Sequence, residues 1–135
     1  MKKYIVIGNP INHSLSPRLQ SYWLKINKIS AVYEREKLQE SDLDNFISRI
    51  RNKKINGANV TIPFKRKIIS FLDELTPEAQ STQSVNTIYL DKNKVIGHNT
   101  DISGFEFSIK DTGYNVSGKK ILILGAGGVA PSIIY

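Results

Sequence analysis

The segment Gly57–Lys65 constrains the fold of this chain more than any other part of its sequence. It begins with small and β-branched residues and carries no charge before its final lysine, which is typical of a buried strand. Pro63 cannot donate to a sheet ladder and favours an extended conformation at the preceding residue, so the strand should end there. Because proline suits the first turn of a helix, we expect a helix from Phe64 to about Leu72.

Lys65 therefore follows the carboxyl end of a strand, which is the edge where open α/β sheets bind ligands. Asn59 and Thr61 alternate with apolar residues, so two polar side chains share one face of a strand that otherwise resembles core. Two interpretations stay open at this point. These side chains either satisfy nearby backbone groups beside a solvated lysine, or they belong to a binding site with Lys65.

Composition narrows the classes of function. A length of 135 residues allows one domain with a core, but hardly two. The absence of cysteine excludes a disulfide framework and favours the cytoplasm, and His13 and His98 are too isolated to predict a metal site. The net charge of +7 suits an anionic small molecule. Nucleic acid is not expected because the lysines are scattered, and the N-terminal apolar run is too short for a signal peptide or a membrane span.

The first third of the chain predicts two strands and two helices. Lys3–Ile7 and Ala31–Glu36 have strand patterns, and Ser41 is expected to open a helix whose apolar stripe is Leu43, Phe46, Ile47 and Ile50. Ser16 and Pro17 predict an N-cap and a first helical position. That helix should end near Asn27 and bury Leu19, Tyr22, Trp23 and Ile26. Ser14, two residues before the cap, has no such structural task and is the better ligand candidate.

A β-hairpin is predicted over residues 85–97, with its turn at Asp91–Asn93. Antiparallel pairing places a residue early in one strand near a residue late in the other, so Asn86 should lie close to Asn99 and Asp101. Asp101 could also cap the following helix, predicted over Ile102–Thr112. The two roles are compatible because a cap holds a carboxylate rigid.

The last segment predicts a phosphate-binding turn. Lys120–Leu124 is an apolar strand pattern, and a G-x-G-x-x-A sequence follows at once, formed by Gly125, Ala126, Gly127, Gly128, Val129 and Ala130. Glycines at these positions allow a tight turn and the close approach of a pyrophosphate to a helix N-terminus. The acidic residue that would bind a ribose, expected about 20 positions later, falls beyond Tyr135.

Together these segments resemble the shikimate dehydrogenase family. The resemblance rests on five motifs in the family's order, spread over the whole chain: Gly8–Pro10 with His13–Pro17, Asn59–Lys65, Val85–Thr87, Asn99–Asp101 and Gly125–Gly128. One departure is Ile102, because many members have glycine after the Asn-Thr-Asp triplet. The other is length, because members continue through a complete dinucleotide-binding domain.

The resemblance implies roles for single residues. Ser14 and Ser16 would bind the substrate carboxylate, Lys65, Asn86 and Asp101 the ring hydroxyls, and Thr61 would line the pocket. Lys65 and Asp101 would form the catalytic pair. The implied reaction is the reversible reduction of 3-dehydroshikimate to shikimate with NADPH, in aromatic amino acid biosynthesis, and the loop Gly125–Ala130 would bind NADP.

The predicted fold class is α/β, with a mostly parallel sheet, flanking helices and one hairpin, followed by an incomplete start of a Rossmann domain. We expect a substrate domain at residues 1–101, a helix and linker at 102–118, and the first strand and glycine loop of a dinucleotide domain at 119–135. The expected partner is the small-molecule substrate, without nucleic acid or membrane, and a homodimer is compatible with the sequence.

Alternative hypotheses remain. The chain could be a shikimate-binding module or inactive fragment without catalysis, or part of an enzyme that uses quinate as well as shikimate. A flavodoxin-like signalling domain fits less well, because Asn12–Pro17 offers hydroxyls where phosphate-binding or acidic groups would be needed.

Overall fold

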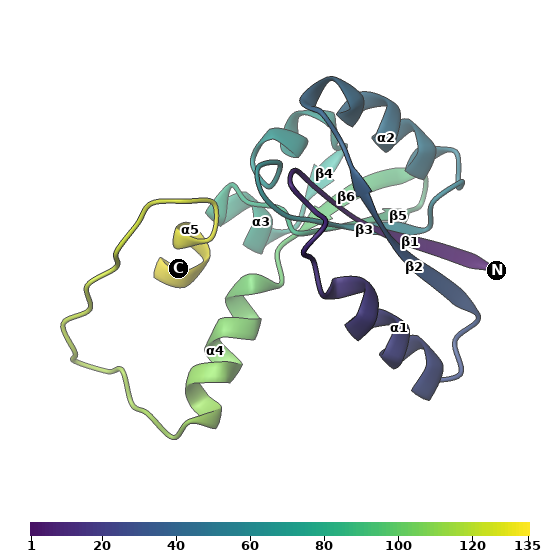
Figure 1. The fold of residues 1–135 in the computed structure, drawn as a ribbon. Coiled ribbons are helices and arrows are strands. Elements are labelled where there is room, and N and C mark those ends of the chain that lie inside the picture. Colours follow the sequence, from purple (N-terminus) through teal and green to yellow (C-terminus); the bar gives the residue numbers. More distant parts are fainter.

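The computed structural model describes residues 1–135 and contains one six-stranded sheet with the strand order β2-β1-β3-β5-β6-β4 (Figure 1). The strands are β1 Lys2–Gly8, β2 Ala31–Lys37, β3 Gly57–Val60, β4 Glu74–Leu75, β5 Thr87–Asp91 and β6 Lys94–His98. Strand β1 runs parallel to β2 and β3, and β4 runs parallel to β6. Strand β5 is antiparallel to both of its neighbours. The predicted fold class is confirmed.

Parallel pairing brings the loops after β1 and β3 to the same edge of the sheet. Ile7 of β1 is in register with Val60 of β3, so the two strands end side by side. The backbone N–H of Asn9 donates to the carbonyl of Ile62 at 3.0 Å and joins the two loops directly beyond that edge. The segments that carry Ser14 and Lys65 therefore start from neighbouring points.

The two faces of the sheet are covered unequally. Helix α2 (Leu43–Arg51) buries its predicted stripe of Leu43, Phe46, Ile47 and Ile50 on one face, in a core cluster of 16 residues. Helix α1 (Ser16–Ile26) lies on the opposite face, beside the edge strand β2 (Figure 1). Leu24 of α1 packs against that face in a small cluster with Tyr4 and Tyr33.

The predicted buried face of α1 is wrong. Leu19, Tyr22, Trp23 and Ile26 are 47%, 59%, 47% and 54% exposed. Their spacing does form an apolar stripe, but α1 contacts the sheet mainly along its edge strand β2. A stripe in the sequence predicts which residues share a helix face, and no element of this chain lies over that face.

Other local predictions also needed correction. The expected helix Phe64–Leu72 is a shorter 3-10 helix, η2 (Lys67–Phe71), which follows a turn at Pro63. Ser41 does not open α2, because a 3-10 turn, η1 (Glu40–Asp42), capped from Gln39, precedes it. The short strand β4 and helix α3 (Pro77–Thr82) were not predicted, although Thr76 followed by Pro77 is an ordinary helix-start signal.

The hairpin is confirmed, since β5 and β6 pair in antiparallel register around Lys92 and Asn93, which have φ values of 44° and 66°. After it, helix α4 (Asp101–Asp111) and a long extended segment lead to the short helix α5 (Ala130–Ile134) (Figure 1). The predicted strand Lys120–Leu124 is absent, and Leu122 and Leu124 are 82% and 88% exposed. Within this chain that segment has no neighbouring strand to pair with.

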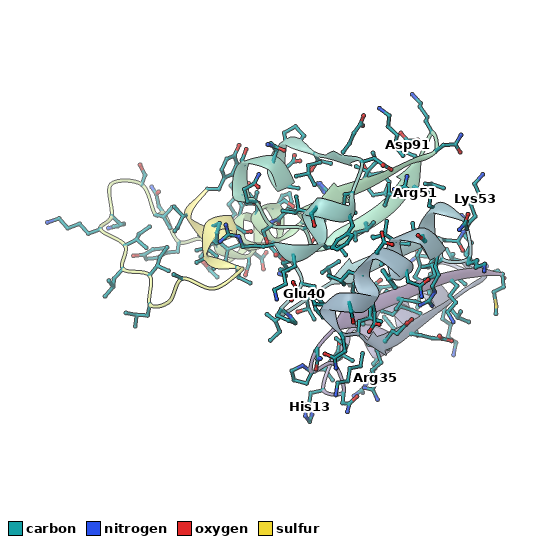
Figure 2. The ribbon with its side chains drawn as sticks, turned by 90° about the horizontal axis from the view of Figure 1, so that it is seen from above. His13, Arg35, Glu40, Arg51, Lys53 and Asp91 are labelled. Carbon is teal, nitrogen blue, oxygen red and sulfur yellow. The ribbon has the colours of Figure 1, made fainter.

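Charged side chains point outward from many elements, including Arg35 on β2, Arg51 on α2 and Asp91 at the hairpin turn (Figure 2). The positive charge is thus spread over the surface, as the scattered lysines indicated. None of the helices combines the length and the apolar character that a membrane span requires.

Candidate active site

Lys65 and Asp101 form an ion pair at the centre of the candidate site. The Lys65 Nζ lies 2.7 Å from the Asp101 Oδ2, and the two side chains are 10% and 27% exposed. Lys65 comes from the turn after β3, and Asp101 is the first residue of α4, three residues after the end of β6. The Lys65 carbonyl accepts a hydrogen bond from the Val85 N–H at 2.8 Å, which fixes the turn against the start of the hairpin.

Asn86 holds the second oxygen of the same carboxylate. Its Nδ2 donates to the Asp101 Oδ1 at 2.8 Å and to the Thr100 Oγ1 at 2.8 Å. Its Oδ1 accepts from the Thr100 N–H at 3.0 Å. The predicted proximity of Asn86 and Asp101 is therefore confirmed, and it follows from the register of the hairpin, in which Thr87 lies opposite His98.

This arrangement leaves Asp101 with one oxygen on an ammonium group and the other on an amide. The carboxylate makes these two side-chain contacts, and Thr100, the N-cap residue of α4, forms no side-chain cap bond. Charge-assisted hydrogen bonds of this kind are short and directional. The site therefore presents a mostly buried ammonium group with a fixed orientation, which can donate a proton to an oxygen atom placed beside it.

Ser14 has a structural contact that the sequence did not predict. Its Oγ accepts a hydrogen bond from the Ser16 N–H at 3.3 Å, and the N-cap residue of α1 is Leu15. The prediction that Ser16 caps the helix is wrong, because no side-chain cap bond forms and Ser16 already lies within α1. The hydroxyl before the helix satisfies its first turn, and the hydroxyl of Ser16 is left for other partners.

Ser14 lies beside two arginines at the edge of the sheet. Ser14 lines a shallow depression of about 570 Å³ together with Leu15, Pro17, Arg18, Glu34 and Arg35. Two guanidinium groups beside a hydroxyl favour an anionic group. Neither Ser14 nor Ser16 forms a hydrogen bond with Lys65, and the backbone hydrogen bond from Asn9 to Ile62 links their two loops.

Thr61 lies between these two parts of the site. Its backbone N–H donates to the Ile7 carbonyl at 3.0 Å, so β3 stays attached to β1 beyond the end of the ladder. A Cβ atom at Gly8 would lie 2.6 Å from the Thr61 methyl group, which means that only glycine fits there. The threonine is half-buried and held in place by this packing.

The glycine loop lies against the candidate site. Gly125 has a φ of +116°, which requires glycine, and there is open space where a Cβ of Gly127 would lie. The Ser84 Oγ donates to the Gly128 carbonyl at 3.0 Å, and a Cβ at Gly128 would lie 3.9 Å from the Lys65 Cβ. The loop Gly125–Ala130 therefore combines backbone suited to a phosphate group with a position beside Lys65.

Sequence analysis placed Asn99 near Asn86 but did not predict that its buried amide supports this site. Asn99 is 1% exposed, and its Nδ2 donates to the Ser84 carbonyl at 2.9 Å and to the Thr82 Oγ1 at 3.1 Å. Its Oδ1 accepts from the Asp101 N–H at 2.8 Å. A polar residue directly after the buried strand β6 was the available signal.

Comparison with known proteins identifies the family. A model of the shikimate dehydrogenase substrate binding domain matches residues 6–88. The chain belongs to the shikimate dehydrogenase family. A shikimate dehydrogenase (NADP(+)) of Pelagibacter ubique is 58% identical over 133 residues, which are 98% of this chain and 50% of that protein. A shikimate dehydrogenase (NADP(+)) of Desulfitobacterium hafniense is 42% identical over 98% of this chain and 49% of its own length.

Solved structures of shikimate dehydrogenases have the same fold. The enzyme of Aquifex aeolicus matches with a TM-score of 0.93 and 37% identity, over 99% of this chain and 50% of its own. The Thermus thermophilus enzyme, solved in complex with NADP(H) and shikimate, matches with a TM-score of 0.90 and 32% identity, over 98% and 50% of the two chains. The chain thus spans about half the length of these shikimate dehydrogenases.

Proposed function

We propose that this chain is the substrate-binding half of an NADP-dependent shikimate dehydrogenase, joined to the beginning of its dinucleotide-binding domain. The reaction is the reversible reduction of 3-dehydroshikimate to shikimate, in aromatic amino acid biosynthesis. The observation that carries the proposal is the Lys65–Asp101 ion pair, in which Asn86 holds the second carboxylate oxygen. Membership of the family and the names of the relatives support the same assignment.

The residues of this chain would handle the proton and the substrate. NADPH, when bound, supplies the hydride. The Lys65 ammonium group, held by Asp101 at 2.7 Å, donates a proton to the carbonyl oxygen that is being reduced. In the oxidation direction the unprotonated Lys65 nitrogen accepts the proton of the substrate hydroxyl group, which restores the ammonium group. Asp101 and Asn86 place further polar atoms beside the Lys65 ammonium group, where they can bind the ring hydroxyls.

The substrate carboxylate would bind at the start of α1. Ser14 and Ser16 provide hydroxyl groups there, and Arg18 and Arg35 add positive charge around the depression. Thr61 would line the pocket between this end and Lys65. The site would thus have carboxylate-binding groups at one end and hydroxyl-binding groups at the other. Shikimate carries its carboxylate and its hydroxyl groups at opposite ends in the same way.

The loop Gly125, Ala126, Gly127, Gly128, Val129 and Ala130 would hold the pyrophosphate of NADP. It fits this group because its backbone is free of side chains at Gly127 and its conformation at Gly125 requires glycine. We retain the division into residues 1–101, 102–118 and 119–135 as part of the proposal. A cytoplasmic location and a homodimer are further parts of it, the latter open to test by sedimentation.

The direct test is calorimetric titration of residues 1–135 with shikimate and, separately, with quinate. Binding of shikimate that is weakened in Lys65→Met and unchanged in Lys67→Met supports the proposal, because Lys67 is exposed and pairs with Glu40 on the surface. Equal binding of quinate would identify the enzyme as a quinate/shikimate dehydrogenase. Absence of any binding would reject the substrate assignment for this chain.

The second candidate is a binding module without catalysis. It is distinguished by a chimera that joins residues 1–135 to the remaining half of the Pelagibacter ubique relative, which is 58% identical in the shared half. Reduction of 3-dehydroshikimate by the chimera supports the enzyme. A folded chimera that binds shikimate and does not turn over supports the module.

A further inference from the structure

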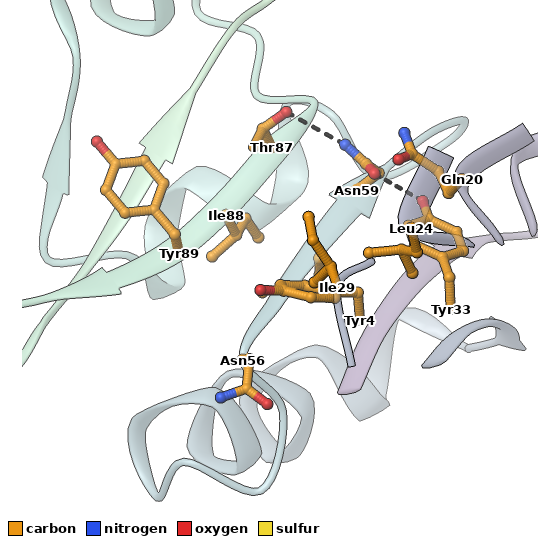
Figure 3. Close-up of a pocket in the computed structure, with 12 residues that line it drawn as sticks. Tyr4, Gln20, Leu24, Ile29, Tyr33, Asn56, Asn59, Thr87, Ile88 and Tyr89 are labelled. Atoms are coloured by element: carbon orange, nitrogen blue, oxygen red, sulfur yellow. Dashed lines mark hydrogen bonds between the residues drawn. The ribbon is translucent and has the colours of Figure 1, made fainter. Parts of the chain in front are cut away.

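A continuous chain of hydrogen bonds runs from the open face of the sheet to the Lys65–Asp101 pair. The Tyr33 hydroxyl donates to the Asn59 Oδ1 at 2.6 Å, and the Asn59 Nδ2 donates to the Thr87 Oγ1 at 3.2 Å (Figure 3). The Thr87 hydroxyl then donates to the Asn86 Oδ1 at 2.9 Å. Asn86 in turn donates to Asp101, so the chain ends on the carboxylate that holds Lys65.

Strand pairing, rather than loop structure, places these side chains together. Asn59 of β3 is directly in register with Thr87 of β5. On the other side, β3 pairs with β1 and β1 pairs with β2, which brings Tyr33 to the same face. Tyr33, Asn59 and Thr87 line one pocket of about 370 Å³ on this face (Figure 3). Side chains on three strands of one hydrogen-bonded sheet have little freedom to separate.

The chain has a defined direction because each hydroxyl group has a single proton. Thr87 accepts a hydrogen bond from the Asn59 amide nitrogen, so its own proton is free to point to the Asn86 oxygen. The backbone carbonyl of Asn86, at 3.1 Å from the Asn59 Nδ2, takes the other amide proton of Asn59. Burial raises the pKa of Tyr33 to about 12, so the first donor keeps its proton at neutral pH.

This direction decides which end of the Asn86 amide faces Asp101. The Asn86 oxygen is occupied by two donors, the Thr87 hydroxyl and the Thr100 N–H. The amino end must therefore face Asp101, where it is 2.8 Å from the Oδ1. The reversed amide would point an oxygen at a carboxylate, and that arrangement is repulsive. One Asp101 oxygen is thereby fixed, and the other is presented to Lys65.

We infer that Tyr33, Asn59 and Thr87 are positioning residues of the active site, which orient the amide of Asn86 and through it the Lys65–Asp101 pair. Thr87 is the most important of the three because it contacts Asn86 directly. None of them needs to touch the substrate for this role. The inference rests on the proposed function, because the oriented Asn86 and Lys65–Asp101 pair would serve to bind the polyhydroxylated ring of the substrate.

The test is shikimate affinity of residues 1–135 in two variants of similar size. Thr87→Val keeps the shape of the side chain and removes the hydroxyl, whereas Thr87→Ser keeps the hydroxyl. We expect Thr87→Val to weaken shikimate binding about fivefold, the loss typical of one hydrogen bond, and Thr87→Ser to restore it. A merely structural role would lower the melting temperature of Thr87→Val without changing the dissociation constant, and that result would overturn the inference.

A matched pair of tyrosine variants tests the far end of the chain. Tyr33→Phe removes the first donor, while Tyr89→Phe removes a hydroxyl that lines the same pocket and makes none of these bonds. We expect weaker binding about twofold in Tyr33→Phe and wild-type binding in Tyr89→Phe. Equal affinities in the two variants would confine the positioning role to Thr87 and contradict the role assigned to Tyr33.

A measurement without ligand separates this inference from the proposed function. If wild-type protein binds no shikimate, the substrate assignment fails, and the side-chain amide signals of Asn86 in nuclear magnetic resonance spectra still report the network. Signals that move in Thr87→Val and return in Thr87→Ser support the positioning role. Signals that stay in place in both variants overturn it.

Discussion

The Asn99 Nδ2 donates a hydrogen bond to the Ser132 Oγ at 2.9 Å, which joins the end of the β-hairpin to helix α5, 33 residues later in the chain. Both side chains are buried, at 1% and 3% exposure. The same asparagine binds the backbone N–H of Asp101 through its oxygen. One amide thus connects the segment after the glycine loop to the first residue of α4.

This contact predicts different effects for its two partners. Asn99→Ala should lower the free energy of unfolding by about 2 kcal/mol, because several buried groups lose their partner together. Ser132→Ala should cost about 1 kcal/mol or less and should mainly release α5. Urea denaturation measures the first effect, and faster amide hydrogen exchange confined to residues 130–134 measures the second. Equal losses in both variants would contradict a central role for Asn99.

Lys65→Met should remove catalysis more than binding. In the chimera with the Pelagibacter ubique half, we expect kcat to fall far more than KM rises, because the proton is transferred only as the reaction proceeds. Lys67→Met is the matched control, since its exposed ammonium group pairs with Glu40. Steady-state kinetics of both variants measure the effect. A rise in KM with unchanged kcat would reduce Lys65 to a binding residue.

Ser14 and Ser16 are expected to differ in stability. Ser14→Ala should lower the free energy of unfolding by about 0.5–1 kcal/mol, because the Ser16 N–H loses its acceptor. Ser16→Ala should leave stability within about 0.5 kcal/mol of wild type, because its hydroxyl forms no cap bond. Both variants should weaken shikimate binding. Thermal denaturation measures the stability of each variant, and calorimetry measures its shikimate binding. A larger loss of stability in Ser16→Ala than in Ser14→Ala would show that Ser16 caps the helix after all.

The caps and the hydrogen-bond chain show where sequence reasoning reached its limit. Asn86 was placed near Asp101 correctly, because antiparallel pairing follows from the pattern around Asp91–Asn93. Which hydroxyl satisfies the first turn of α1 depends on the path of the loop before it, which the pattern Ser-Leu-Ser-Pro does not specify. The link between Asn59 and Thr87 needs the β3–β5 register, and residues 28 apart carry no local signal of it.

The wrong prediction of a buried stripe on α1 has a different cause from the errors at the caps. Periodicity correctly grouped Leu19, Tyr22, Trp23 and Ile26 on one side of a helix, but it cannot show whether another element covers that side. The pairing of Lys65 with Asp101 was only partly predictable from the sequence. The family resemblance implied it, and its short distance depends on the tertiary contact between the turn after β3 and the start of α4.

Tyr33 predicts a loss of stability at high pH. Its folded-state pKa of about 12 lies above the ordinary value of 10.0, because burial disfavours the charged phenolate. The unfolded state therefore releases this proton first, so the contribution of Tyr33 is complete below about pH 10 and declines as the pH rises towards 12. The difference in unfolding free energy between wild type and Tyr33→Phe should shrink over that interval. A difference that stays constant would show that the hydroxyl is not shielded.

The last prediction is that residues 1–135 alone do not catalyse hydride transfer, although they bind shikimate. Lys65, Asp101 and Asn86 are in place, but catalysis also requires the nicotinamide to be held against the reacting carbon, and such positioning supplies much of the rate. The loop Gly125–Ala130 can contact a pyrophosphate, whereas Leu122 and Leu124, from the segment where a sheet strand was expected, are 82% and 88% exposed. No part of this chain remains to enclose the adenosine or the nicotinamide. We therefore expect no consumption of NADPH with 3-dehydroshikimate, followed by absorbance, and turnover in the chimera under the same conditions. Enzyme-dependent loss of NADPH with residues 1–135 would mean that the substrate half and its glycine loop suffice to hold the nicotinamide.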